Sequence, residues 1–169
     1  NEKYCIFHHE DMPLYDTPDI NFINEKVKLM ENDSIDCIRL TNSGDLGLPA
    51  ENYKDYNNLF YSSKISLHFT IHPSLFKINT IKELYRKCTI NKLHDFEINA
   101  HKISISMNLK NLYYYGGEPR RGRFHCDSNV YPYIATAIVK GKWNYSEYKN
   151  ELTILHNEYK IDKNIRGYV

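Results

Sequence analysis

Long apolar runs, paired-cysteine motifs, repeats and linkers are all missing from this sequence. The longest apolar stretch, residues 132–139, is far shorter than the roughly 18 residues that a membrane-spanning helix needs. The first residues show no charged-then-apolar signal pattern, and no run of five like charges occurs anywhere. We therefore expect no membrane span and no polybasic or polyacidic tail.

The length predicts one domain over residues 1–169. A hydrophobic content of 41% is enough for a buried core and excludes wholesale disorder. Because the chain begins with Asn1 rather than Met, a C-terminal fragment of a longer chain stays open as an alternative.

The four cysteines form no CxxC pair, which argues against a zinc ribbon and against a redox dithiol. Their spacing favours buried free thiols, and two disulfides in a secreted domain are the alternative. No metal site is expected either. His68 and His72 would stand about 13 Å apart on a strand, and the adjacent His8 and His9 would point to opposite sides.

Alanine is scarce, whereas Ile, Tyr and Thr are plentiful, and this bias favours strands over helices. Apolar alternation and short apolar runs predict strands at 4–7, 35–40, 65–72, 103–107, 133–139, 152–155 and 165–169. Helical patterns cover 20–30 and 80–88. We therefore predict an α+β fold: a small strand-rich domain with two or three helices, and two small sheets flanking a cleft.

Charge is divided unevenly along the chain. Residues 1–60 hold 12 Asp and Glu against 5 Lys and Arg, and residues 61–169 hold 9 against 17. The first part therefore carries a formal charge of −7 and the second +8. Such a division is typical of a basic surface for a phosphate-bearing partner, or of two parts that attract each other across the fold.

The segment from Tyr113 to Arg123 interleaves aromatic and cationic residues around two glycines. Tyr115 is a candidate to stack on a base or a nicotinamide ring, and Arg120 and Arg121 are candidates to clamp phosphates. An exposed hairpin with half-buried tyrosines is the alternative interpretation.

A second candidate site lies on the predicted strand 65–72, where His68, Thr70 and His72 would share one face. A His and a Thr two residues apart can hold one phosphate, so this face indicates a metal-independent nuclease or phosphodiesterase toxin. The basic part of the chain, residues 61–169, would then hold a nucleic-acid backbone. A second His-x-Thr/Ser strand, which two-histidine phosphoesterases need, is missing from the sequence.

The end of the chain places Glu151 immediately before a predicted strand, 152–155, with a second short strand after it at 165–169. His8 and His9 directly follow the predicted first strand, 4–7, and Tyr61 lies further along the chain. This order of strand histidine, aromatic residue and late strand glutamate resembles ADP-ribosyltransferase domains of the bacterial toxin and effector type. The sequence departs from that pattern at Glu10, where the family usually has a small residue.

The resemblance implies that the chain binds NAD and transfers ADP-ribose to a protein or nucleic-acid acceptor, or cleaves NAD. Glu151 would stabilise the oxocarbenium-like charge, His9 or His8 would hold a ribose, and Tyr61 would stack on nicotinamide. Arg120 or Arg121 would meet the pyrophosphate. The resemblance also implies that the protein is secreted or delivered into a target cell. If the resemblance does not hold, we expect the protein in the cytoplasm.

A second branch of the same family uses an arginine, a Ser-x-Ser motif and a paired glutamate. Arg39 and Ser62 would take the first two places, but Lys149 stands where the partner glutamate belongs. A third hypothesis is a non-catalytic binding module that recognises a partner through the tyrosine-rich loop. Oligomeric state is not indicated by any of these patterns.

Overall fold

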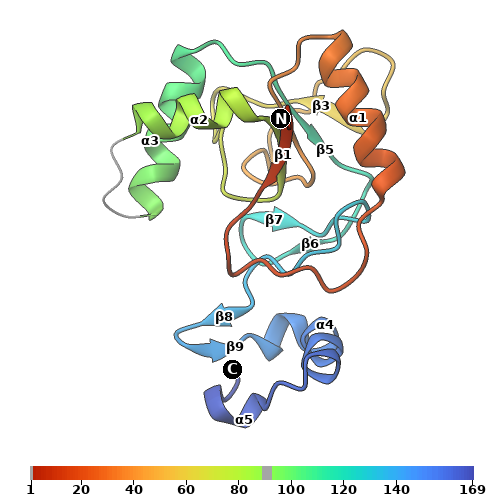
Figure 1. The fold of residues 1–169 in the computed structure, drawn as a ribbon, viewed down its shortest axis with the longest axis vertical. Helices are drawn as coiled ribbons and strands as arrows, with labels where there is room; N and C mark the ends of the chain where they lie inside the picture. The colour runs from red at the N-terminus through yellow and green to blue at the C-terminus, as the bar shows by residue number, and fades with distance from the viewer. Residues whose placement is uncertain (1, 89–92) are drawn as a thin grey trace.

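A five-stranded mixed sheet forms the centre of the computed structural model, which describes residues 2–88 and 93–169 (Figure 1). The strands lie in the order β1-β4-β2-β5-β3, and only the β2–β5 pair is parallel. Their bounds are β1 Tyr4–Phe7, β2 Cys37–Arg39, β3 Leu59–Tyr61, β4 Ser74–Lys77 and β5 Asn111–Tyr114.

Helices cover both faces of this sheet. Helix α1 (Ile20–Asn32) packs on one face, and α2 (Ile78–Lys87) and α3 (Leu93–Ser106) pack on the other. The sheet has two apolar faces because successive strand residues point to opposite sides. Ile38 and Leu75 join the cluster under α1, whereas Cys37 and Phe76 join the cluster under α2 and α3.

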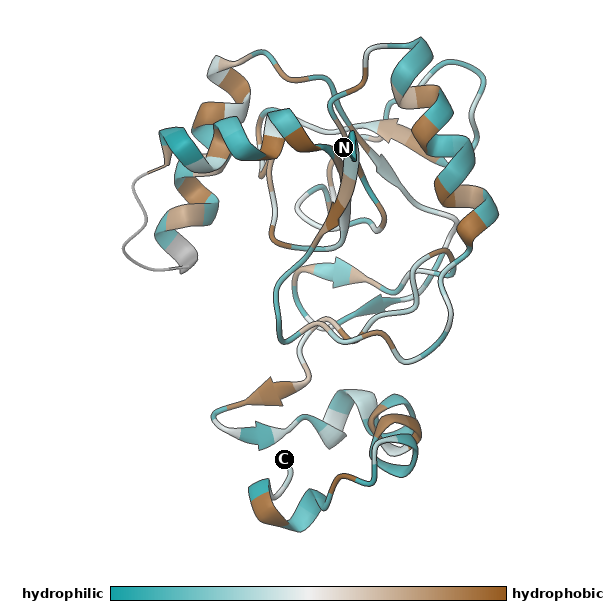
Figure 2. Ribbon diagram, viewed as in Figure 1, coloured by the Kyte–Doolittle hydropathy of each residue, from teal (hydrophilic) through white to brown (hydrophobic). Residues whose placement is uncertain are grey.

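Local sequence explains where α1 begins. The Asp19 side chain accepts a hydrogen bond from the Phe22 N–H at 2.9 Å and caps α1. Ile23, Lys26 and Met30 then recur at helical spacing and are buried. Apolar and polar residues alternate along α1 and α2 in Figure 2, as one buried side requires.

The last part of the chain forms a smaller unit at one end of the sheet. It contains hairpin β8–β9 (Ile138–Val139 and Lys142–Trp143), α4 (Tyr145–Glu158) and α5 (Lys163–Arg166). Hairpin β6–β7 (Arg120–Arg121 and His125–Cys126) lies between this unit and the sheet (Figure 1). A third apolar cluster, which includes Leu40, Ile134 and Leu152, joins the two parts into one domain.

The predicted α+β class is confirmed, and so are the first two strands and the first two helices. The number of helices was underestimated, since the described residues contain five, and one large sheet with two hairpins replaces two small sheets. All four cysteines are free thiols, as favoured, and Cys37 and Cys126 are buried. In the part of the chain that the structure describes, no helix has the length and apolarity to cross a membrane.

The predicted strand 65–72 is wrong, because the segment is irregular. Its alternation does not sort the residues into a buried and a solvated face: Ile65 is 90% exposed, whereas His68 and Thr70 are buried. Side chains hold its backbone instead. The His68 N–H donates to His101 Nδ1 at 2.9 Å, and Asn111 Nδ2 donates to the His68 carbonyl at 2.9 Å.

Three further predicted strands are also wrong. Residues 103–107 fall at the end of α3, 152–155 lie within α4, and 165–169 lie in α5 and the tail after it. The last two segments are only four and five residues long, and so short a segment fits both the two-residue period of a strand and the 3.6-residue period of a helix. Of 133–139, only Ile138–Val139 form a strand; the remainder is apolar because it is buried against other segments.

Candidate functional site

A cavity of about 900 Å³ lies at the end of the sheet where β1 and β2 terminate. Both strands run antiparallel to β4, so their carboxyl ends lie at the same end of the sheet. The residues after β1 and β2 and those before β4 therefore line one wall. Hairpin β6–β7 and the C-terminal unit supply the other walls. Ligands in sheets flanked by helices commonly bind at this end.

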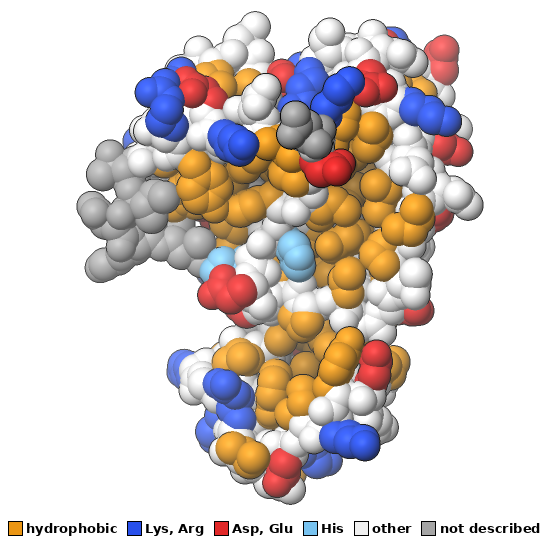
Figure 3. Space-filling model, in the orientation of Figure 1, with side chains coloured by type: hydrophobic (Ala, Val, Ile, Leu, Met, Phe, Trp, Pro, Cys, Tyr) orange, Lys and Arg blue, Asp and Glu red, His pale blue; other side chains and the backbone are white. Residues whose placement is uncertain are grey.

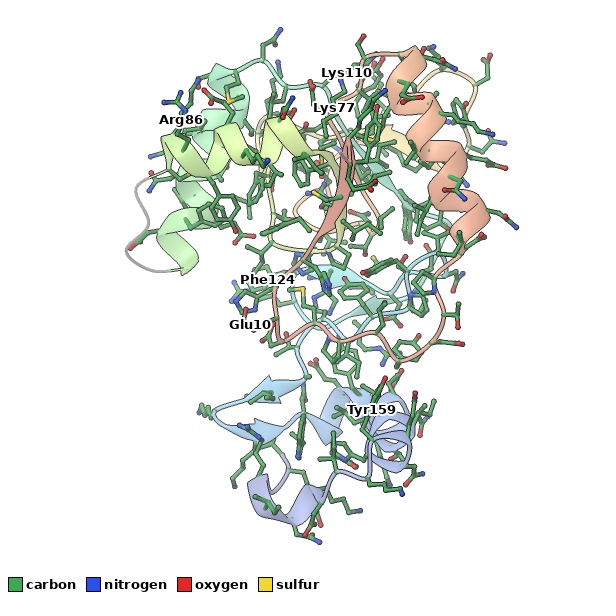
Figure 4. The ribbon with its side chains drawn as sticks, in the orientation of Figure 1. Glu10, Lys77, Arg86, Lys110, Phe124 and Tyr159 are labelled. Carbon is green, nitrogen blue, oxygen red and sulfur yellow. The ribbon has the colours of Figure 1, made fainter. Side chains whose placement is uncertain are left out.

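Figure 3 shows hydrophobic side chains across the middle of the molecule. In the same view the molecule narrows just above the C-terminal unit. Glu10 and Phe124 lie at this narrowing in Figure 4, above β8. Phe124 is 63% exposed and lines the cavity, so the cavity opens here. Lys77, Arg86 and Lys110 lie at the opposite end of the molecule.

Two neighbouring histidine rings, one buried and one half-buried, form part of the cavity wall. The rings of His72 and His125 lie 5.5 Å apart, and the Tyr148 hydroxyl is 2.7 Å from His125 Nε2. Burial is the main cause that lowers the pKa of His72 to about 3 and of His125 to about 4, although the Glu147 carboxylate opposes the shift of His125. Both rings are therefore neutral at pH 7. Among the described residues, nothing hydrogen-bonds the buried Nδ1 of His72.

Acidic side chains reach the cavity from three elements. Asp11 follows β1 and lies 2.6 Å from His9 Nδ1, and Glu97 on α3 accepts the Ile71 N–H at 3.1 Å. Glu147 at the start of α4 is exposed and lies 3.4 Å from the Asn144 side-chain amide. Carboxylates so placed can stabilise positive charge or accept a proton.

Arg120 and Arg123 supply positive charge at the rim. Within residues 2–88 and 93–169, neither guanidinium forms an ion pair with a carboxylate; Arg120 donates to the Arg123 carbonyl at 2.6 Å. Unpaired guanidinium groups at a cavity mouth can bind a phosphate or diphosphate with two hydrogen bonds each.

Gly122 allows the β6–β7 turn to approach this wall closely. Its φ of +67° lies in the left-handed region, and an added Cβ would stand 3.2 Å from the His125 ring and 3.5 Å from Glu147 Oε2. The turn can therefore bring the arginines beside the histidine and glutamate without a side chain between them.

The three predicted catalytic residues are not gathered at this cavity. His9 lines it, but Tyr61 lies on β3, at the other edge of the sheet from β1. Four strand spacings separate these edges, which amounts to about 19 Å. Tyr61 packs edge-on against Tyr53 instead.

Glu151 lies on a helix rather than at a strand start, and Arg121 holds it. Arg121 donates to Glu151 at 2.6 Å and to Asp127 at 2.8 Å, away from the cavity that the adjacent Arg120 lines. Side chains of successive strand residues point to opposite faces, which explains the split. Non-helical backbone at Tyr148 interrupts α4 between Glu147, which lines the cavity, and Glu151.

Arg39 and Ser62 are brought together, but inside the protein. The Arg39 guanidinium, 3% exposed, forms an ion pair with Asp45 and donates to Ser62 Oγ at 3.1 Å. Asp45 also accepts the Ser63 N–H at 2.8 Å. This buried network fixes the loops after β2 and β3, so it supports the cavity wall rather than touching a ligand.

The remaining predicted residues are divided. Thr70 and His72 line the cavity, whereas His68 is buried behind it with Nδ1 3.0 Å from Ser104 Oγ. His8 lines a second, smaller cavity, and Tyr115 follows β5 with its N–H bonded to the Asn58 carbonyl.

Sequence reasoning missed three cavity residues: Glu97, His125 and Glu147. Each is a common polar residue without a local motif, and only the chain path brings them together. In the described ranges, no set of three His, Cys, Asp or Glu side chains is arranged to hold a metal ion. No protein-family model matches the chain, and no curated protein matches it.

Proposed function

We propose that the chain is a glycosyl-transfer enzyme whose donor is a sugar joined to a nucleotide diphosphate. NAD is the donor to test first, with transfer of ADP-ribose to a macromolecular acceptor or to water. The observation that carries the proposal is that one cavity combines rim arginines that form no ion pair among the described residues with an exposed carboxylate and neutral imidazoles. Its volume of about 900 Å³ lies within the range of cofactor sites.

Each group has a chemical task in this proposal. Arg120 and Arg123 bind the diphosphate through charge-assisted hydrogen bonds. As the bond from the anomeric carbon to nicotinamide breaks, nicotinamide takes the electron pair and positive charge develops on the ribose. Glu147 stabilises that charge. The acceptor oxygen then bonds to the anomeric carbon and loses its proton to Glu147 or to solvent.

In this proposal Glu147 takes the part that the resemblance gives to Glu151. The two carboxylates lie four residues apart, but Glu151 is neutralised by Arg121 and Glu147 is not paired with a cation in the described part of the chain. An available carboxylate interacts more strongly with a developing cation than one already paired with a guanidinium.

The test is nicotinamide release from NAD, measured by chromatography with and without added protein and nucleic-acid acceptors. Glu147→Gln should lower the rate by about 100-fold or more, because the amide carries no charge. Glu158→Gln is the matched control, since Glu158 lies exposed near the other end of α4. Equal activity of wild type and Glu147→Gln would refute the role of Glu147.

If NAD is not cleaved, release of the nucleoside diphosphate from UDP-glucose and other nucleotide sugars, followed by the same chromatography, tests the broader donor class. Loss of donor binding in Arg120→Ala separates the diphosphate contact from the chemical step. A protein that binds none of these donors would overturn the proposal.

A second candidate function is metal-independent phosphodiester cleavage, favoured by the close His72 and His125 rings beside Thr70. One imidazole would take the proton of the attacking hydroxyl and the other would protonate the leaving oxygen. Their lowered pKa values count against it at pH 7, since a general acid must be protonated there. Cleavage of RNA or DNA that His72→Gln abolishes and Glu147→Gln spares would select this function.

A further inference from the structure

The C-terminal unit ends in a protruding tip. Helix α5 lies at the end of the long axis of the molecule, away from the sheet (Figure 1). Arg166 donates to the Gly141 carbonyl at 3.4 Å, so α5 and the turn of hairpin β8–β9 lie together. The exposed side chains of this end line neither cavity, and we call them the tip surface: Lys140, Lys142, Lys163, Ile165, Arg166 and Tyr168.

Positive charge gathers at the tip surface. Four of its six side chains belong to Lys or Arg, and Asp162 is the only acidic residue within 138–143 and 159–169. Asp162 caps α5, where its side chain accepts the Asn164 N–H at 2.9 Å. Within the described ranges, none of the four cations forms an ion pair. Figure 3 shows Lys and Arg side chains grouped on one side of this unit.

An aliphatic side chain is exposed among these cations. Lys163 Nζ lies 5.6 Å from the Tyr145 ring, and the Arg166 guanidinium lies 5.5 Å from the Trp143 ring. These two residues, three apart, share the face of α5 that packs on the unit, and Ile165 lies on another face. Ile165 is 86% exposed, so that face is turned to solvent. Figure 2 shows it as a hydrophobic segment between hydrophilic ones.

The charge alone would suit a nucleic acid, an acidic protein or an anionic membrane. Single-stranded nucleic acids stack their bases on open aromatic faces. Trp143 and Tyr145 already contact a cation and the His156 ring, so they offer little room for a base. A convex end also gives little contact area to a folded protein. Hydrocarbon takes up an exposed isoleucine while lysines and arginines stay with lipid phosphates, so the combination favours a membrane.

We propose that the tip surface binds peripherally to a membrane that contains anionic lipids. The four cations contact the lipid headgroups. Ile165 and Tyr168, which is 55% exposed, enter the interfacial layer. The proposal does not depend on the glycosyl-transfer function, because no residue of the tip surface lines the larger cavity.

Co-sedimentation of the protein with lipid vesicles measures this binding. Vesicles of phosphatidylcholine with about 30% phosphatidylglycerol should bind it, with half-binding at or below about 1 mM lipid. Pure phosphatidylcholine vesicles should bind it at least about tenfold more weakly. Sodium chloride at about 0.5 M should release it from the anionic vesicles, because salt screens exposed charges. Equal binding to both lipid compositions would overturn the proposal.

Two matched pairs of variants locate the surface. Lys142→Glu should weaken binding to the anionic vesicles by about fivefold or more. Lys82→Glu makes the same change of net charge on α2, at the other end of the molecule, and should leave binding unchanged. Ile165→Ser should weaken binding by about threefold or more. Ile65→Ser, at a 90% exposed position between β3 and β4, is its control and should have no effect.

All four positions are exposed, so the variants should fold as the wild type does, and circular dichroism checks this. Equal weakening by Lys82→Glu and Lys142→Glu would show that net charge rather than the tip drives binding, and the proposal would fail. It would fail as well if Ile165→Ser bound like the wild type. Binding to single-stranded RNA without binding to vesicles would assign the tip surface to a nucleic acid instead.

Discussion

Single side chains determine the pH response of this protein, because three histidines are held as neutral rings: His68 and His125 are buried, and His72 is half-buried. Burial is the main cause that lowers the pKa of His68 to about 4, of His72 to about 3 and of His125 to about 4. Burial also raises the pKa of the Cys37 thiol to about 12, so this cysteine stays protonated and unreactive at neutral pH.

The folded protein should lose stability as the pH falls from about 6.5 towards 4. Above pH 6.5 these histidines are neutral in both the folded and unfolded chains. Below it the unfolded chain binds protons that the folded chain does not, so the free energy of unfolding decreases until the folded pKa values are reached. Urea denaturation at a series of pH values measures this slope.

His72→Gln should reduce the slope, because one of the histidines with a lowered pKa is then missing. His72 is the suitable position because its buried Nδ1 has no partner to lose among the described residues. A free energy of unfolding that stays constant between pH 6.5 and 4 would contradict this account.

At the same scale, sequence and structure differ most over which polar residues meet. The His9 position could be predicted, since it follows a short apolar strand and the cavity lies where strands end. The partners Glu97 and Glu147 could not, because each comes from a distant helix and carries no local motif. Arg39 and Ser62, which the resemblance places in one site, do contact each other, but inside the protein and together with Asp45, which has no pattern in the sequence.

At the scale of elements, prediction succeeded where one period was clear. Helices α1 and α2 each have a single apolar face, and β1 is a run of four apolar residues whose side chains pack alternately on the two faces of the sheet. It failed for α4, where Leu152 and Ile154 suggested a strand although Tyr148, Leu152 and Leu155 are buried at helical spacing. A short apolar stretch fits both periods, and only tertiary packing distinguishes them.

The helical assignment of α4 predicts unequal costs for two alanine substitutions. Leu152 is 1% exposed and Ile154 is 49% exposed. Leu152→Ala should therefore lower the free energy of unfolding by about 2–4 kcal/mol, because it opens a cavity in the core. Ile154→Ala should lower it by less than about 0.5 kcal/mol.

Chemical denaturation of both variants measures these costs. In a strand the two side chains would share one face and would be buried or exposed together. Similar losses in both variants would therefore favour the strand and contradict the helix.

At the scale of the whole molecule, some of the charges that are divided along the sequence pair inside the fold, and others lie without a partner of opposite charge among the described residues. Among the paired charges, Asp36, from the acidic part, contacts Lys77 at 3.3 Å and accepts the Lys110 N–H at 3.0 Å. Arg120 and Arg123 are not paired with carboxylates in the described ranges and face the larger cavity. The positive charge that the proposed function uses is therefore local to the β6–β7 turn.

The C-terminal unit is set apart from the sheet in Figure 1, yet its core is shared with the remainder of the chain. Leu152 and Leu155 of α4 belong to the same apolar cluster as Met12 and Leu40. Separating the unit from the sheet would expose this cluster to water, and the cost grows with the apolar area exposed. The two parts should therefore unfold together.

Two optical signals test this cooperativity. Trp143 reports on the C-terminal unit alone, whereas far-ultraviolet circular dichroism reports on all helices and strands. In urea, the two signals should give one coincident transition, as expected of a single domain. Leu152→Ala should shift both midpoints to lower urea by the same amount. A tryptophan transition that precedes the dichroism transition would mean that the C-terminal unit opens independently, and the wall it gives to both cavities would then open with it.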